Sequence, residues 1–148
     1  MSPVPKALNK RVQRPDLPLL RAFGRADDRS FATAHNWPVS APSEADLNLL
    51  YSAALEFGLN WRRPLNRLAS ERMPDRAESY RNAVALLVEQ SRAEIEAYIN
   101  DAFTRSNREW HATDAGETET WIAERFPWMT PRNRTHGISQ GVYYAWHG

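Results

Sequence analysis

Four polar side chains follow a glycine in the stretch 47–72, and they are of the types that proteins use to bind nucleic acids or acidic partners. They are Arg62, Arg63, Asn66 and Arg67. Arginine can form two hydrogen bonds with guanine, asparagine can do the same with adenine, and the remaining side chains can hold phosphates. The stretch is therefore a candidate binding site.

The spacing of Ala54 and Gly58 favours a helix-turn-helix-like corner at 47–72. In that motif a small residue on the first helix and a glycine in the turn let the second helix lie in the major groove. The inward apolar residues Leu65 and Leu68 come one place late for the motif, and Pro64 occupies the earlier position. A structural helical hairpin with a solvated arginine face is the preferred interpretation, because Ala-x-x-x-Gly is also a common way to end a helix.

The charges of the chain are segregated, although the net charge is only +1. Residues 1–25 sum to +5, residues 60–81 to +3 and residues 88–124 to −6. The basic arm, with Lys10 and Arg11, could reach a nucleic-acid groove or another acidic partner. The opposite blocks could equally pair with each other inside the fold.

Arg132 and Arg134 lie between Trp128 and a cluster of aromatic residues near the end of the chain, Tyr143, Tyr144 and Trp146. Aromatic side chains interleaved with arginines are typical of proteins that hold single strands. The same aromatic residues can instead form a hydrophobic clasp for a small domain.

No pattern of catalytic or cofactor-binding residues is found in the sequence. The chain lacks cysteine, which excludes disulfides, thiolate metal sites and cysteine nucleophiles. There is no glycine-rich phosphate loop, zinc-protease motif or nucleophile elbow. The histidines have no ligand spacing; they are His35, His111, His136 and His147. We expect no catalytic residue, no metal site and no cofactor, and an enzyme of unknown class is the third alternative.

The hydrophobic pattern predicts helices that would position these residues. Ser43 is a suitable N-cap for a helix that ends before Gly58. A second helix is predicted from Trp61 to Arg72, capped by Asn60. Asp75 and Glu78 resemble a capping box at the start of a long helix, at about 75–106.

The long helix carries a second, narrower apolar row opposite its main stripe. The row consists of Leu86, Ala93 and Ala97. Because an exposed apolar row on a helix needs a neighbour, either another segment of the chain or a second copy of the protein is expected to cover it. Self-association is therefore a further expectation.

The final third is predicted to contain a loop at 107–116, a short helix from Glu117 that Pro127 stops, and the tail 129–148. Val142, Tyr143, Tyr144 and Trp146 favour a strand, whereas the tail also fits one face of a helix, with Ile138, Val142, Ala145 and Trp146. No other segment alternates cleanly to pair with a strand. We therefore predict an irregular or short-strand tail. Residues 1–16 are predicted to be an extended or disordered arm, with residues 17–148 forming a single helical domain.

The sequence as a whole predicts an all-α protein, a small helical bundle around one long helix. With no apolar run long enough to span a membrane and no secretory signal, the expected location is the cytoplasm. The expected function is non-catalytic binding of another macromolecule, either a protein partner or a second copy of the chain. A DNA-binding regulator that uses the corner at 47–72 and the basic arm is the alternative.

Overall fold

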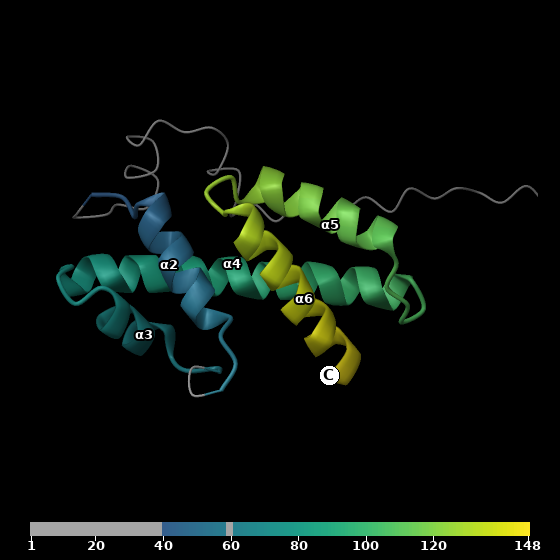
Figure 1. Ribbon diagram of the computed structural model, residues 1–148, viewed down its shortest axis with the longest axis horizontal. Coiled ribbons are helices and arrows are strands. Elements are labelled where there is room, and N and C mark those ends of the chain that lie inside the picture. Colours follow the sequence, from purple (N-terminus) through teal and green to yellow (C-terminus); the bar gives the residue numbers. More distant parts are fainter. Residues whose placement is uncertain (1–39, 59–60) are drawn as a thin grey trace, which may run out of the picture.

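The computed structural model describes residues 40–58 and 61–148, and this part of the chain is all-α (Figure 1). Its helices are α2 (Glu44–Ala54), α3 (Leu65–Arg72), α4 (Glu78–Arg105), α5 (Ala112–Arg125) and α6 (Pro131–His147). The prediction of a helical bundle is thereby confirmed. The predictions for the arm 1–16, including Lys10 and Arg11, lie outside the described residues.

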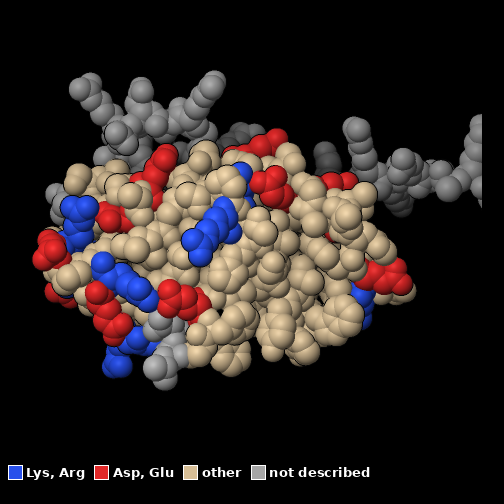
Figure 2. Space-filling view, viewed as in Figure 1, with Lys and Arg blue, Asp and Glu red and all other residues tan. Residues whose placement is uncertain are grey.

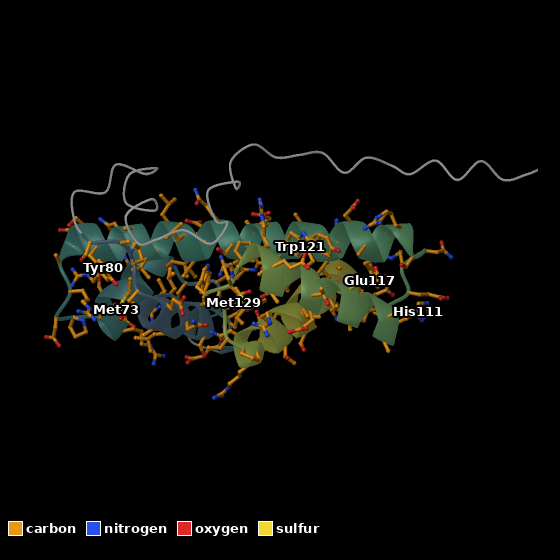
Figure 3. The ribbon with its side chains drawn as sticks, turned by 90° about the horizontal axis from the view of Figure 1, so that it is seen from above. Met73, Tyr80, His111, Glu117, Trp121 and Met129 are labelled. Atoms are coloured by element: carbon orange, nitrogen blue, oxygen red, sulfur yellow. The ribbon has the colours of Figure 1, made fainter. Side chains whose placement is uncertain are left out.

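The long helix α4 organises the bundle, as the sequence predicted. Its 28 residues make it about 42 Å long. The other described helices all contact it and pack on the same side of it (Figures 1 and 3). Val84, Val88, Ile95 and Ile99 form the fully buried stripe of α4. No helix in this part of the chain is apolar over enough residues to cross a membrane.

The start of α2 is fixed by the predicted cap and by a buried polar network. The Ser43 hydroxyl accepts a hydrogen bond from the Asp46 amide at 3.1 Å. The Tyr80 hydroxyl of α4 donates to the Asp46 carboxylate at 2.7 Å, and Arg76 pairs with the same carboxylate at 3.2 Å. Because each buried polar group has a partner, the network joins α2 to the beginning of α4 without an uncompensated charge.

The prediction that α3 begins at Trp61 is wrong, because α3 begins at Leu65 with Pro64 as its N-cap. A residue before proline is sterically kept out of the helical region, so Arg63 cannot continue a helix into Pro64. Arg62 instead has a positive φ of 54°. The predicted cap, Asn60, lies outside the described residues.

Gly58 makes the turn after α2 with a φ of 89°, a conformation that strongly favours glycine. We expect Gly58→Val to lower the free energy of unfolding by about 1 to 3 kcal/mol through backbone strain, since a β-branched residue is disfavoured at this φ. No atom lies within 4 Å of the added Cβ, so a steric clash does not contribute. Urea denaturation would measure the change, and an unaltered midpoint would contradict the strain.

The starts of α4 and α5 also differ from the predictions. The N-cap of α4 is Ala77, without a side-chain hydrogen bond, so Asp75 and Glu78 do not form the predicted capping box. Helix α5 begins at Ala112, inside the predicted loop 107–116. There the amide of His111 donates to the Asp114 carboxylate at 2.8 Å, a contact that stabilises the first turn.

The prediction of an irregular or short-strand tail is wrong, because residues 131–147 form helix α6. Its N-cap is Thr130, whose hydroxyl accepts from the Asn133 amide, and Pro131 occupies the first turn. Both residue types are favoured at these positions. The aromatic and β-branched residues of the tail thus lie on a helix whose stability comes from its tertiary contacts.

Two glycines let α6 lie close to the rest of the bundle. A Cβ at Gly137 would be 2.5 Å from the Tyr51 hydroxyl oxygen of α2, and a Cβ at Gly141 would be 2.4 Å from Ile99 Cδ1 of α4. Tyr51 is almost fully buried, and this burial raises the pKa of its phenol. The two glycines are one helical turn apart. Because neither carries a side chain, this side of α6 can lie close to α2 and α4.

A single asparagine on α2 fixes the start of α6. The Asn48 amide nitrogen donates to the Trp128 carbonyl at 2.6 Å. Its side-chain oxygen accepts from the Thr130 amide and from the Asn133 side chain, both at 2.9 Å. Farther along α6 the buried Gln140 side chain donates to the Leu55 carbonyl. These bonds orient α6 and determine which of its sides faces outward.

Candidate functional site

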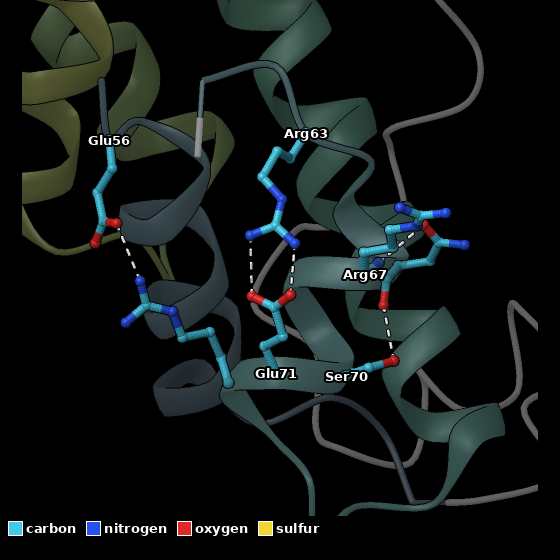
Figure 4. A network of polar contacts seen from close by, with 7 residues as sticks. Glu56, Arg63, Arg67, Ser70 and Glu71 are labelled. Carbon is cyan, nitrogen blue, oxygen red and sulfur yellow. Dashed lines mark hydrogen bonds and ion pairs between the residues drawn. The ribbon is translucent and has the colours of Figure 1, made fainter. Parts of the chain in front are cut away.

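The arginine corner is partly neutralised by acids of its own chain (Figure 4). Arg63 donates to both carboxylate oxygens of Glu71, at 3.0 and 2.5 Å. This pairing lowers the pKa of Glu71 and raises that of Arg63. Arg72 pairs with Glu56 at 3.0 Å. A guanidinium held by a carboxylate would have to break that pair before it could bind a phosphate or a base edge.

The residues of the predicted site lie at two different places on the surface. Arg63, Asn66 and Arg67 line an open polar groove of about 330 Å³ between α3 and α4, which also contains Glu71, Glu78 and Arg81. Arg62 lies apart from this groove, with its guanidinium 4.4 Å from the centre of the Tyr144 ring. The corner therefore mixes both charges and does not present its arginines as one group.

The predicted self-association row lies on the surface in the described part of the chain. Leu86 is 49% exposed, and Ala93 and Ala97 are also exposed. None of the described helices covers the row. It is therefore accessible, as an interface between two copies requires. Self-association itself stays a prediction.

A cluster of large aromatic side chains forms a more prominent surface, which we call the aromatic face. It comprises Phe57 (59% exposed), Trp61 (47%), Tyr143 (45%) and Trp146 (61%). The Phe57 ring contacts those of Trp61 and Tyr143, with centroids 6.5 and 6.1 Å apart. Trp61 Nε1 donates to the Tyr144 hydroxyl at 2.6 Å. The face thus joins the α2–α3 loop to the C-terminal end of α6.

From Thr135 onward, α6 continues this surface without charge. The sequence has no Asp, Glu, Lys or Arg between Thr135 and Gly148. Figure 2 shows a broad uncharged area over α6, with the charged side chains concentrated elsewhere on the same view. A quarter of the whole chain is charged, so a run of more than three helical turns without Asp, Glu, Lys or Arg on a surface helix needs an explanation beyond solubility.

A groove beside α6 adds an apolar depression to the surface. It has a volume of about 420 Å³ and lies between α5 and α6. Trp110, Ala115, Ile138 and Val142 supply its apolar lining, and Glu119, Thr135 and Ser139 supply its polar groups. Val142 borders the groove and lies one helical turn from Trp146 of the aromatic face, so the two features adjoin along α6. We call this feature the α5–α6 groove.

The aromatic residues of the tail do not form the single-strand platform considered from the sequence. Trp128 is buried in the core. Arg134 is bound to the Glu119 carboxylate at 2.8 Å and to the Met129 carbonyl at 2.7 Å. Tyr143 and Trp146 remain exposed, and Arg132 is exposed at the start of α6.

The aromatic face was not identified from the sequence as one surface. Phe57 and Trp61 are distant from α6 along the chain, and only the packing of α2 against α6 brings them beside Tyr143. The feature of the sequence that could have indicated this surface is the long uncharged run that contains Tyr143 and Trp146.

The described residues contain no group of three or more His, Asp or Glu side chains that could hold a metal ion. The exposed polar groups of the corner and the exposed aromatic rings are instead suited to non-covalent contact with another molecule. No family model matches this chain, and no curated protein or solved structure is significantly similar to it.

Proposed function

We propose that this chain is a non-catalytic protein-binding module that contacts its partner through the aromatic face. The observation that carries the proposal is the exposure of Phe57, Trp61, Tyr143 and Trp146 on one surface. Burying such side chains would remove a large apolar area from water, which is the main favourable contribution to protein association.

The composition of this surface supports a protein partner. Tryptophan, tyrosine and arginine are the residues that most often dominate the energy of protein interfaces. Here Trp61 donates to the Tyr144 hydroxyl, and the Arg62 guanidinium stacks on the ring of the same tyrosine. The absence of charged residues from α6 after Arg134 matches the depletion of charged residues at interface centres.

The same geometry weighs against the DNA-binding alternative. A protein that holds DNA must neutralise several phosphates, and its affinity depends on how many. In the corner, Arg63 and Arg72 are already paired with glutamates. The helix α3 has only 8 residues and begins after Arg62 and Arg63, so these two side chains cannot project from it into a groove.

Photo-crosslinking in cells of the organism that encodes the chain tests the proposal. The photoreactive residue benzoylphenylalanine replaces Ser139, which is exposed on the outer side of α6 between Arg132 and Tyr143. Thr120 on α5 is the matched control, because it is also exposed and its hydroxyl also bonds only the carbonyl four residues earlier. We expect discrete adducts with another protein from position 139 and none from position 120.

The mass and composition of the adducts decide between the function classes. An adduct that contains a second protein supports the proposal. Adducts that nuclease removes, or that contain lipid, would contradict it, as would equal yields from the two positions. An adduct of twice the chain mass would indicate that the partner is a second copy of the protein.

A further inference from the structure

We infer that the aromatic face and the α5–α6 groove together bind one amphipathic helix of the partner protein, with acidic residues flanking the apolar side of that helix. This inference rests on the proposed function and specifies its partner. The inference follows from the shape, the size and the charge of the surface.

The surface has a line of exposed side chains on α6 with a depression beside it. Ser139, Tyr143 and Trp146 recur at spacings of four and three residues, so they lie along one line on α6. From Ser139 to Trp146 this line is about 10 Å long, and the whole of α6, with 17 residues, is about 25 Å long. The α5–α6 groove runs along its flank, with Ile138 and Val142 of α6 in its lining. A helix that places apolar residues at every third or fourth position fits such a strip and groove.

The size of the surface suits one helix better than a second copy of the chain. The four aromatic side chains, each roughly half exposed, offer about 400 Å² of apolar area. Two such faces packed against each other would bury about 800 Å² in total, well below the roughly 1,600 Å² of a standard stable interface. A single helix needs no more than the strip and the groove provide.

The charges around the surface select an acidic partner. Arg62 lies at the C-terminal end of α6 beside Tyr144, and Arg132 lies at its exposed N-terminal end. Neither arginine has an ion pair within the described ranges. The nearby carboxylates are already engaged, since Glu119 is bound to Arg134 and Glu56 to Arg72. Acidic residues on a docked helix would meet unpaired positive charge at both ends of the strip.

Binding of two designed peptides by the full chain tests the inference. Both peptides are fluorescent helices of about 18 residues, or five turns, with leucine at every third or fourth position. One carries glutamate on the remaining positions and the other carries lysine. Fluorescence anisotropy measures their affinities at about 50 and 200 mM salt, where screening of exposed charges differs. We expect saturable binding of the glutamate peptide, at least about tenfold tighter than that of the lysine peptide.

Variants separate the apolar and the electrostatic contributions. Tyr143→Ser with Trp146→Ser should weaken binding of the glutamate peptide by at least about tenfold while the melting temperature stays unchanged. Arg62→Gln with Arg132→Gln should remove the preference for glutamate but leave some binding of both peptides. Arg105→Gln is the control, because Arg105 is exposed on α4 and paired with Asp101, away from this surface.

Several results would overturn the inference. They are the absence of saturable binding by the glutamate peptide, equal or tighter binding of the lysine peptide, and insensitivity to the aromatic substitutions. A parallel titration uses vesicles with about 30% anionic lipid, whose surface attracts exposed arginines. Vesicle binding that needs Tyr143 and Trp146, without peptide binding, would assign the surface to a membrane instead. If the peptides fail while position 139 still crosslinks to a protein, the proposed function stands and only the acidic helix is wrong.

Discussion

Gly137→Val is expected to lower the free energy of unfolding by about 3 kcal/mol, near the upper end of what overpacking a core contact costs. The new Cβ alone would lie 2.5 Å from the Tyr51 hydroxyl oxygen and 3.4 Å from the ring carbon that bears it. Tyr51 cannot move aside easily, because its ring is rigid and buried between α2 and α6. Either α6 must rise from the bundle or the ring must leave its position.

Gly116→Val is the matched control for this prediction. Gly116 also lies inside a helix, α5, but no atom comes within 4 Å of a Cβ added there. Valine and glycine differ by only a few tenths of a kcal/mol in helix propensity, so we expect the stability to change by less than about 0.5 kcal/mol. Urea denaturation of both variants measures the difference. Equal destabilisation at the two positions would show that the close approach of α6 to Tyr51 is absent.

Asn48→Ala is expected to lower the free energy of unfolding by about 2 to 3 kcal/mol, because it removes four hydrogen bonds and leaves buried partners unsatisfied. The Asn48 side chain donates to the Glu44 and Trp128 carbonyls and accepts from Thr130 and Asn133. Asn133 is itself buried, so its amide would keep only its bond to the Asn48 carbonyl.

Two further variants make this prediction specific. Asn48→Asp keeps the accepting oxygen but loses both donors, and it would place an oxygen opposite the Trp128 carbonyl, so we expect it not to restore stability. Asn66→Ala is the control, because the Asn66 side chain is exposed and its recorded bond is to the neighbouring amide of Arg67. Thermal unfolding compares the three, and a stability of Asn48→Ala equal to that of Asn66→Ala would contradict the role of Asn48.

The sequence predicted the parts of the fold that depend on local chemistry and on long periodic patterns. Ser43 is an N-cap because its hydroxyl reaches a nearby amide, and this needs no tertiary contact. The stripe of α4 extends over many turns, so its pattern is unambiguous. The start of α3 could have been predicted as well, because the steric effect of Pro64 on Arg63 is also local.

The helix α6 could not be predicted in this way, since its stability depends on contacts distant in sequence. Tyr143, Tyr144 and Val142 favour strands, and Gly137 and Gly141 weaken an isolated helix. In the folded chain the two glycines allow close packing against Tyr51 and Ile99. Asn48 supplies bonds to the start of the helix from more than 80 positions away. Tertiary packing thus overrides the local preferences.

The candidate site shows the same division between local and distant information. The types of the corner residues were apparent from the sequence, but the pairing of Arg63 with Glu71 was not, because eight residues separate them and helical neighbours are three or four apart. The exposure of Trp146 and Tyr143 depends on which side of α6 is buried. Sequence alone therefore indicated candidate binding residues without showing which surface they form.

The most direct test of the proposed function is crosslinking from position 139 with and without Tyr143→Ser and Trp146→Ser. Both aromatic side chains are about half exposed, so their loss should leave the melting temperature within about 2 °C, as is usual for surface substitutions. We expect the protein adduct formed by the unsubstituted chain to disappear in this variant while the fold is retained. An adduct that persists at the same yield would contradict the role of the aromatic face in binding a partner.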